Sequence, residues 1–136
     1  MRVGDKKPMT QEKSSGLEYI TFQAGEIIFT EGDIGDRAYI IESGKIEIFR
    51  NVGGEKITLG TVEKNGIFGE MALIDEATRM GTASALVKTD CIIVPKLAIQ
   101  SNLADADPLL RKLVNVLLAN ARSLSDHITR VVEKES

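Results

Sequence analysis

Residues 67–85 read IFGEMALIDEATRMGTASA, and this stretch decides the fold and the function that we predict for the chain. Glu70 stands ahead of a short apolar run, Met71 to Ile74, and Arg79 follows after a polar turn. Small residues close the stretch, from Gly81 to Ala85. One acid and one base therefore lie nine positions apart, each beside small residues that leave the backbone accessible.

This pair of charges suits a ligand that carries both hydroxyl groups and an anion. Arginine offers a planar fork of donors for phosphate oxygens, and glutamate accepts hydrogen bonds from sugar hydroxyls in other nucleotide sites. A helix starting near Glu70 would leave N–H groups unpaired in its first turn, which also favours an anion. The alternative is a Glu70 favoured only by the helix dipole and an Arg79 that is solvated on the surface.

The run Phe68-Gly69-Glu70-Met71-Ala72-Leu73, followed by Arg79 and small residues, resembles the phosphate-binding cassette of cyclic nucleotide-binding domains. The resemblance implies that Glu70 holds the ribose 2′-hydroxyl and that Arg79 pairs with the cyclic phosphate. It implies further backbone amides in the cradle, around Gly69, Met71, Ala72 and Met80. The complete set of ligand-binding residues predicted in this way is Phe68, Gly69, Glu70, Met71, Ala72, Arg79, Met80 and Gly81.

The residue after Arg79 bears on the identity of the ligand. Family members that prefer cGMP often place threonine there, and the group of the catabolite activator protein carries serine. This chain has Met80 instead, so we expect cAMP to be preferred, with cGMP as the alternative. Thr78 stands where many members have proline.

Composition excludes several other classes of protein. A formal charge of −3, from 17 basic and 20 acidic side chains, provides no basic surface for nucleic acid, and aromatic residues amount to 4%. No apolar run is long enough to span a membrane. Cys91 is the single cysteine and lies in an apolar run, so we expect a buried thiol and a cytoplasmic protein.

We predict no cofactor, no metal and no catalytic residues. A small metal enzyme of the cupin type would need clustered histidine and carboxylate ligands, and His127 is the only histidine. The acids Glu31, Asp33 and Asp36 are of the type that binds hard cations, but they lack the spacing of a calcium loop. Turn chemistry explains them better.

Short apolar or alternating runs separated by glycine-rich turns predict a small antiparallel barrel or jelly roll. The strands predicted from these runs cover residues 17–22, 27–29, 38–41, 46–48, 57–62, 82–87 and 91–94. The resemblance, which extends over residues 17–130, implies more specifically an eight-stranded antiparallel β-roll, followed by a short helix and a long C-terminal helix. We divide the chain into a flexible arm (1–16), the roll with its cassette (17–95), and a hinge with lid and dimerisation helices (96–136).

The terminal helix is predicted to begin at Asp107-Pro108, with aspartate as the cap and proline in the first turn. Apolar residues recur along it at steps of three or four, namely Leu110, Leu113, Leu117, Ala121, Leu124, Ile128 and Val131. This seam predicts a parallel, coiled-coil-like homodimer. The alternative is a single amphipathic helix that folds back on its own roll.

In the family that the chain resembles, ligand capture tightens the cassette and the terminal helix closes over the base. The corresponding hinge here is 103–107, and the base contacts we nominate are Arg122, Leu124, Ser125 and Ile128. We therefore predict a regulatory cyclic nucleotide sensor. A ligand-free homodimerisation or protein-interaction module on the same fold is the alternative. The sequence shows no recognisable output domain, so the effector can be another protein or a fused domain.

Overall fold

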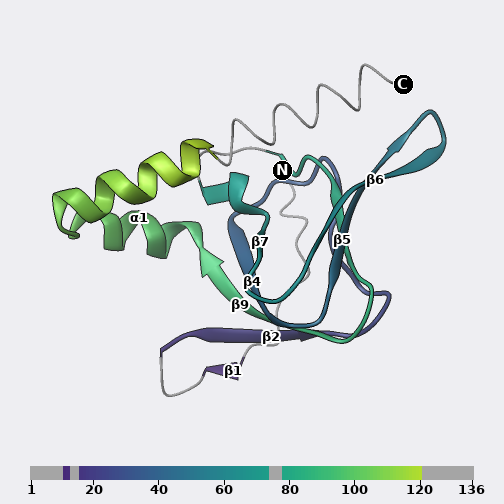
Figure 1. Cartoon of the computed structure of the whole chain (residues 1–136), viewed down its shortest axis with the longest axis horizontal. Coiled ribbons are helices and arrows are strands. Elements are labelled where there is room, and N and C mark those ends of the chain that lie inside the picture. The colour runs from purple at the N-terminus through teal and green to yellow at the C-terminus, as the bar shows by residue number, and fades with distance from the viewer. Residues whose placement is uncertain (1–10, 13–15, 74–77, 121–136) are drawn as a thin grey trace.

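The computed structural model describes residues 11–12, 16–73 and 78–120. Within these ranges the chain forms nine strands in two antiparallel sheets, with helices after the last strand (Figure 1). In sheet order, the five-stranded sheet contains β1 (Gln11–Glu12), β2 (Glu18–Phe22), β9 (Thr89–Pro95), β4 (Arg37–Ser43) and β7 (Ile67–Phe68). The four-stranded sheet contains β3 (Ile27–Phe29), β8 (Thr82–Ala85), β5 (Ile46–Val52) and β6 (Glu55–Val62). The predicted fold class, an antiparallel roll followed by helices, is confirmed.

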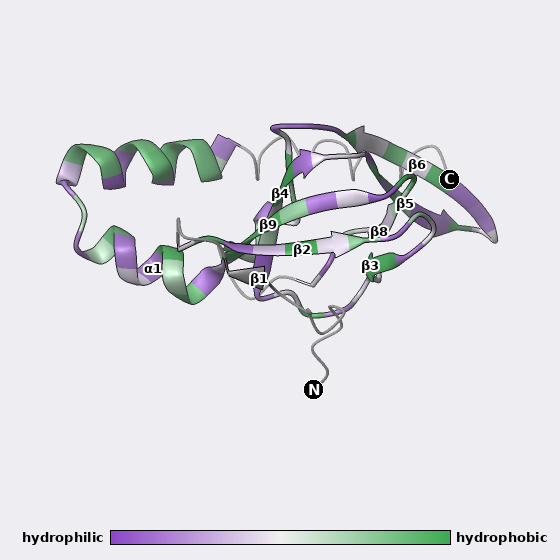
Figure 2. Ribbon diagram, turned by 90° about the horizontal axis from the view of Figure 1, so that it is seen from below, coloured by the Kyte–Doolittle hydropathy of each residue, from purple (hydrophilic) through white to green (hydrophobic). Residues whose placement is uncertain are grey.

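Helices and hairpin occupy opposite ends of the roll. Helix α1 (Lys96–Ala104) follows β9 directly, and the backbone is helical again over 108–120. Both views show these helices at one end and the β5–β6 hairpin projecting from the other (Figures 1 and 2). The hairpin turns through Gly53 and Gly54, whose φ angles of +60° and +84° are those that glycine adopts most readily.

The predicted helix cap is present at Asp107. Its Oδ1 accepts a hydrogen bond of 2.8 Å from the backbone N–H of Leu109. This bond satisfies one of the N–H groups that the first turn of a helix leaves without an intrahelical partner. None of the helices in the described ranges is long and apolar enough to cross a membrane.

An aromatic cluster forms the centre of the core between the two sheets. The ring of Tyr39 stacks on that of Phe68 at 5.1 Å, lies 6.5 Å from that of Phe29, and meets that of Phe22 edge-on at 5.9 Å. All four side chains are buried. Because Phe68 ends β7 just before Gly69, this cluster fixes the start of the cassette to the core.

One detail differs from the sequence predictions. Gln11 and Glu12, placed in the flexible arm, form a strand that pairs with Tyr19 and Glu18 of β2. The outer edge of β2 offers unpaired backbone groups, and a two-residue strand satisfies some of them. Residues 1–10 and 13–15 of the predicted arm lie outside the described residues.

Cys91 lies in the core, as predicted. Its side chain is fully buried on β9, and burial together with the charge of Asp90 raises the pKa of the thiol to about 12. The thiol is therefore protonated at neutral pH and is a poor nucleophile.

Candidate functional site

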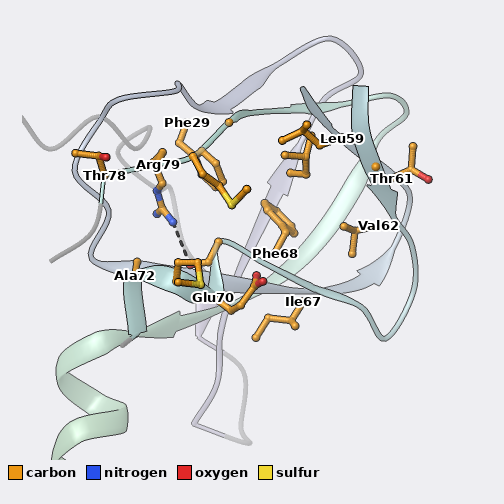
Figure 3. A pocket seen from close by; sticks show the side chains of 16 residues that line it. Phe29, Leu59, Thr61, Val62, Ile67, Phe68, Glu70, Ala72, Thr78 and Arg79 are labelled. Atoms are coloured by element: carbon orange, nitrogen blue, oxygen red, sulfur yellow. Dashed lines mark hydrogen bonds between the residues drawn. The ribbon is translucent and has the colours of Figure 1, made fainter. Parts of the chain in front are cut away.

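The cassette lines a pocket on the roll (Figure 3). β7 leads into it, the first three residues of the 3₁₀ turn η1 (Glu70–Leu73) line it, and Arg79 precedes β8. The structure brings together all eight residues of the predicted ligand set, which are Phe68, Gly69, Glu70, Met71, Ala72, Arg79, Met80 and Gly81. Their contact with a ligand stays a prediction.

Gly69 is the residue that lets the chain turn from β7 into η1. Its φ of +75° is unfavourable for residues with a side chain. A Cβ atom at this position would also lie 2.7 Å from Nη1 of Arg79. The backbone can therefore approach the guanidinium, and Nη1 of Arg79 donates a hydrogen bond of 3.1 Å to the carbonyl oxygen of Gly69.

Arg79 is held in a defined position at the base of the pocket. Its side chain is only 5% exposed, so the alternative of a solvated surface arginine is wrong. Nη2 donates to the carbonyl oxygen of Arg37 at 2.9 Å, and the guanidinium carbon lies 4.0 Å from the centre of the Phe29 ring. The ring and the two carbonyl oxygens hold the planar guanidinium in one orientation.

The backbone of Arg79 is fastened as well. Its N–H donates to the carbonyl oxygen of Asp33 at 2.6 Å, and its own carbonyl oxygen accepts from the N–H of Gly32 at 2.8 Å. An isolated bridge joins Ile34 to Thr78 beside these bonds. The loop between β3 and β4 therefore positions an arginine more than 40 residues further along the chain.

Glu70 is the acidic group of the pocket. Burial raises the pKa of its carboxyl above the ordinary value, while its own backbone N–H and the charge of Arg79 act in the opposite direction. Figure 3 shows its carboxyl group near Phe68 and Ile67, apart from the guanidinium of Arg79. The two charged ends are thus separated, as a ligand with a hydroxyl at one point and an anion at another requires.

The rest of the pocket wall is mostly apolar, and most of it comes from strands that the sequence did not assign to the site. β5 and β6 contribute a run of residues, which are Ile48, Leu59, Gly60, Thr61 and Val62, and the remaining lining residues are Phe29, Ile67 and Thr78. The pairing of the two strands shifts register between Ile48 and Phe49, so Leu59 has no partner across the ladder. A bulge of this kind interrupts the alternation of the strand at Leu59, which together with Gly60 lines the pocket. The signal for it in the sequence is Gly60, because a glycine inside a strand often marks a bulge.

The predicted base contacts Arg122, Leu124, Ser125 and Ile128 lie outside the described residues, as does His127. The predicted hinge at 103–107 does coincide with a break between helices. Helix α1 ends at Ala104 with Asp105 as its C-cap, and the N–H of Ala106 donates to the carbonyl oxygen of Leu103 at 3.2 Å.

Asp33 and Asp36 of the loop after β3 make local polar contacts, as the turn interpretation predicts, whereas the partner of Glu31 lies on β5. Glu31 pairs with Arg50 at 3.1 Å, and Oδ2 of Asp33 accepts from the N–H of Thr30 at 3.3 Å. Asp36 pairs with Arg37 at 2.8 Å, and this hydrogen bond holds the pKa of the Asp36 carboxyl below its ordinary value. Among the described residues, no group of three or more His, Cys, Asp or Glu side chains could hold a metal ion.

The raised pKa of Glu70 predicts a pH dependence of stability. Because the folded state binds the proton more tightly than the unfolded state, whose pKa is near 4.5, the free energy of unfolding should fall as the pH rises through the window just above that value. Glu70→Gln should remove this slope and unfold at higher denaturant concentration at neutral pH. Urea unfolding of the ligand-free chain between about pH 4 and about pH 7 measures both effects. Glu42→Gln, which removes an exposed carboxyl group from β4, is the control, and an unchanged slope in Glu70→Gln would contradict the assignment.

Comparison with known proteins adds independent information. A family model described as a cyclic nucleotide-binding domain matches residues 19–105. The chain is 34% identical, over 105 residues, to a cAMP-dependent protein kinase regulatory subunit of Schizosaccharomyces pombe, with 77% of this chain and 25% of that protein covered. It is 28% identical, over 117 residues, to a CRP-like cAMP-activated global transcriptional regulator of Mycobacterium tuberculosis, with 85% and 52% covered. The chain thus spans about a quarter and about half of these two relatives.

Solved structures of the EAL enzyme Bd1971 are similar to this chain as well. The cAMP-bound form superposes with a TM-score of 0.64 at 39% identity, covering 81% of this chain and 30% of that one. The cGMP-bound form superposes with a TM-score of 0.65 at 35% identity, covering 86% and 32%.

Proposed function

The chain belongs to the cyclic nucleotide-binding domain family, and we propose from this premise that it is a regulatory sensor that binds cAMP in preference to cGMP. The observation that carries the proposal is the position of Arg79, a buried guanidinium at the base of an open pocket whose other charged group is Glu70. The planar guanidinium presents donors that match the oxygens of a phosphate, and the carboxylate of Glu70 can accept from a hydroxyl group of the same ligand.

In the proposed pose, each part of the ligand meets a group that suits its chemistry. The cyclic phosphate lies against Arg79 and against backbone amides of the cassette around Gly69, Met71 and Met80, whereas the N–H of Ala72 donates to the carbonyl oxygen of Gly69 at 3.2 Å. The ribose 2′-hydroxyl donates to Glu70, and the base lies along the apolar wall of β5 and β6. We keep Arg122, Leu124, Ser125 and Ile128 as proposed base contacts from the terminal helix.

The preference for cAMP rests on Met80. This side chain lines the pocket beside Arg79 and has no hydroxyl group that could bind the guanine 2-amino group. Both relatives described above carry cAMP in their names, which supports the proposal. The cGMP-bound form of the EAL enzyme makes cGMP the ligand to test beside it.

Signal transmission is proposed to run from the cassette to the helices. Helix α1 contacts η1, so a cassette that tightens around a ligand changes the surface on which α1 rests. The break at 105–107 then lets the terminal helix move over the ligand. A ligand shifts this equilibrium only by its difference in affinity for the two arrangements. The chain itself would act as a cytoplasmic regulator without catalysis or direct binding of nucleic acid.

Isothermal titration with cAMP and, separately, with cGMP tests the proposed ligand. We expect saturable binding of both at one site per chain, with the tighter binding for cAMP. Tighter binding of cGMP would overturn the role given to Met80. If neither nucleotide produced heat or raised the unfolding temperature, the sensor would be excluded and the ligand-free interaction module would take its place.

We further propose that the chain forms a homodimer through the terminal helix. In its described part, Leu110, Leu113 and Leu117 are 52%, 51% and 57% exposed, and hydrophobic residues dominate this helix (Figure 2). Apolar side chains at this spacing are usually covered by a partner helix. We expect a dimer by light scattering at about 50 μM, which Leu113→Glu converts to a monomer. Asn115→Glu, an exposed site on the same helix with the same change in charge, should stay dimeric; a monomeric parent chain would contradict the proposal.

A further inference from the structure

Gly35 is a glycine that the backbone does not require. Its φ lies outside the left-handed region, unlike those of Gly25, Gly32 and Gly44. A residue with a side chain could therefore adopt the backbone conformation of position 35 without strain. The atoms around position 35, and not its backbone conformation, explain why glycine stands there.

The space beside Gly35 is filled by Arg79. The three atoms nearest to a Cβ built at this position are Cζ, Nε and Nη1 of that side chain, and the farthest of them, Nη1, is only 2.8 Å away. Real Cβ atoms do not approach other atoms so closely. A side chain at position 35 would therefore force the guanidinium of Arg79 out of its present position. At Gly44 and Gly66, in contrast, a Cβ would collide with backbone atoms.

We propose that Gly35 is a positioning residue for the anion site, an inference that rests on the proposed function. Its missing side chain leaves the space in which the guanidinium of Arg79 stacks on Phe29 and donates to the carbonyl oxygens of Gly69 and Arg37. A methyl group at position 35 displaces the guanidinium from these partners and from the direction in which it faces the pocket.

Gly35→Ala should affect the stability of the fold much less than it affects ligand binding. The guanidinium is the flexible end of a long side chain, so it can move aside and the fold absorbs the substitution at small cost. A ligand that needs the planar fork in one orientation does not tolerate the same movement. We expect Gly35→Ala to weaken cAMP binding by about ten-fold or more, the effect of losing a hydrogen bond to a charged group, with only a small change in the unfolding midpoint.

Four proteins test this role: the parent chain, Gly35→Ala, Arg79→Ala and the double variant. In the Arg79→Ala background the colliding atoms are absent, so adding Gly35→Ala should leave the unfolding midpoint unchanged. If Gly35→Ala alone fails to fold, recovery of the fold in the double variant supports the proposal. An equal loss of stability in both backgrounds would show that position 35 matters only to the backbone and would overturn it.

A readout without ligand separates this inference from the proposed function. The side-chain NMR signal of Arg79, identified by its loss in Arg79→Ala, reports the ring current of Phe29 on the guanidinium. Gly35→Ala should shift this signal, whereas Gly60→Ala, where a Cβ would meet open space, should not. An unshifted signal, or unchanged cAMP affinity in Gly35→Ala, overturns the positioning role. Failure of the parent chain to bind cAMP would instead overturn the proposed function.

Discussion

Arg79→Ala is expected to weaken cAMP binding by tens-fold or more, or to abolish it. The substitution removes the planar donors that face the cyclic phosphate, and a hydrogen bond to a charged group contributes about 1.5–3 kcal/mol. The actual loss should lie toward the upper end of that range, because the guanidinium is buried, stacked on Phe29 and already aligned by two carbonyl oxygens. The ligand thus gains the contact without having to order the side chain first.

Arg37→Ala is the matched control for this experiment. It removes the same charge but keeps the carbonyl oxygen to which Arg79 donates, and its own guanidinium pairs with Asp36. Titration calorimetry with cAMP should show near-parental affinity for Arg37→Ala and little or no heat for Arg79→Ala. Arg79→Lys tests the geometry separately, since lysine restores the charge without the fork and should recover only part of the affinity. Unchanged affinity in Arg79→Ala would refute the assigned pose.

Phe22→Ala is expected to cost about 3–5 kcal/mol of unfolding free energy, the range for truncation of a buried phenylalanine. Phe22 is 1% exposed and meets Tyr39 edge-on, and Tyr39 in turn stacks on Phe68 at the entrance to the cassette. The loss is a large fraction of the stability of an ordinary domain, which is about 5–15 kcal/mol. Phe22 does not line the pocket, so the molecules that stay folded should bind cAMP with parental affinity.

Phe49→Ala removes the same atoms from a half-buried position on β5 and serves as the comparison. Nζ of Lys56 lies 4.5 Å from the centre of its ring, a contact worth about 0.5–1 kcal/mol at an exposed site. Denaturant unfolding should therefore place Phe49→Ala much closer to the parent than Phe22→Ala. Similar losses of unfolding free energy in the two variants would mean that the aromatic cluster does not contribute more to stability than a half-buried ring does.

The sequence predicts best where a local rule applies. β3 runs from Ile27 to Phe29 as predicted, because turn residues on both sides of a short apolar run define where the strand begins and ends. Asp107 caps its helix because the bond it makes is with a residue two positions away. The eight cassette residues line one pocket because most of them follow one another along the chain.

The sequence predicts poorly where contacts join distant segments. The β3–β4 loop positions Arg79 through backbone hydrogen bonds of Gly32 and Asp33, which lie more than 40 residues earlier in the chain. The wall supplied by Leu59 and its neighbours depends on a bulge, whose signal in the sequence is a single glycine, Gly60, inside the strand. The strand at Gln11–Glu12 exists only because the edge of β2 lies beside it in space.

The single cysteine has a practical consequence for labelling chemistry. Because Cys91 is buried and its thiol titrates only near pH 12, maleimide reagents at neutral pH have little native thiolate with which to react. An introduced surface cysteine would therefore be modified selectively without prior removal of the native one. A fluorophore on the exposed Asn115 and another at the exposed tip of the β5–β6 hairpin would then form a pair that straddles the molecule. Energy transfer between them would follow the terminal helix as cyclic nucleotide is added.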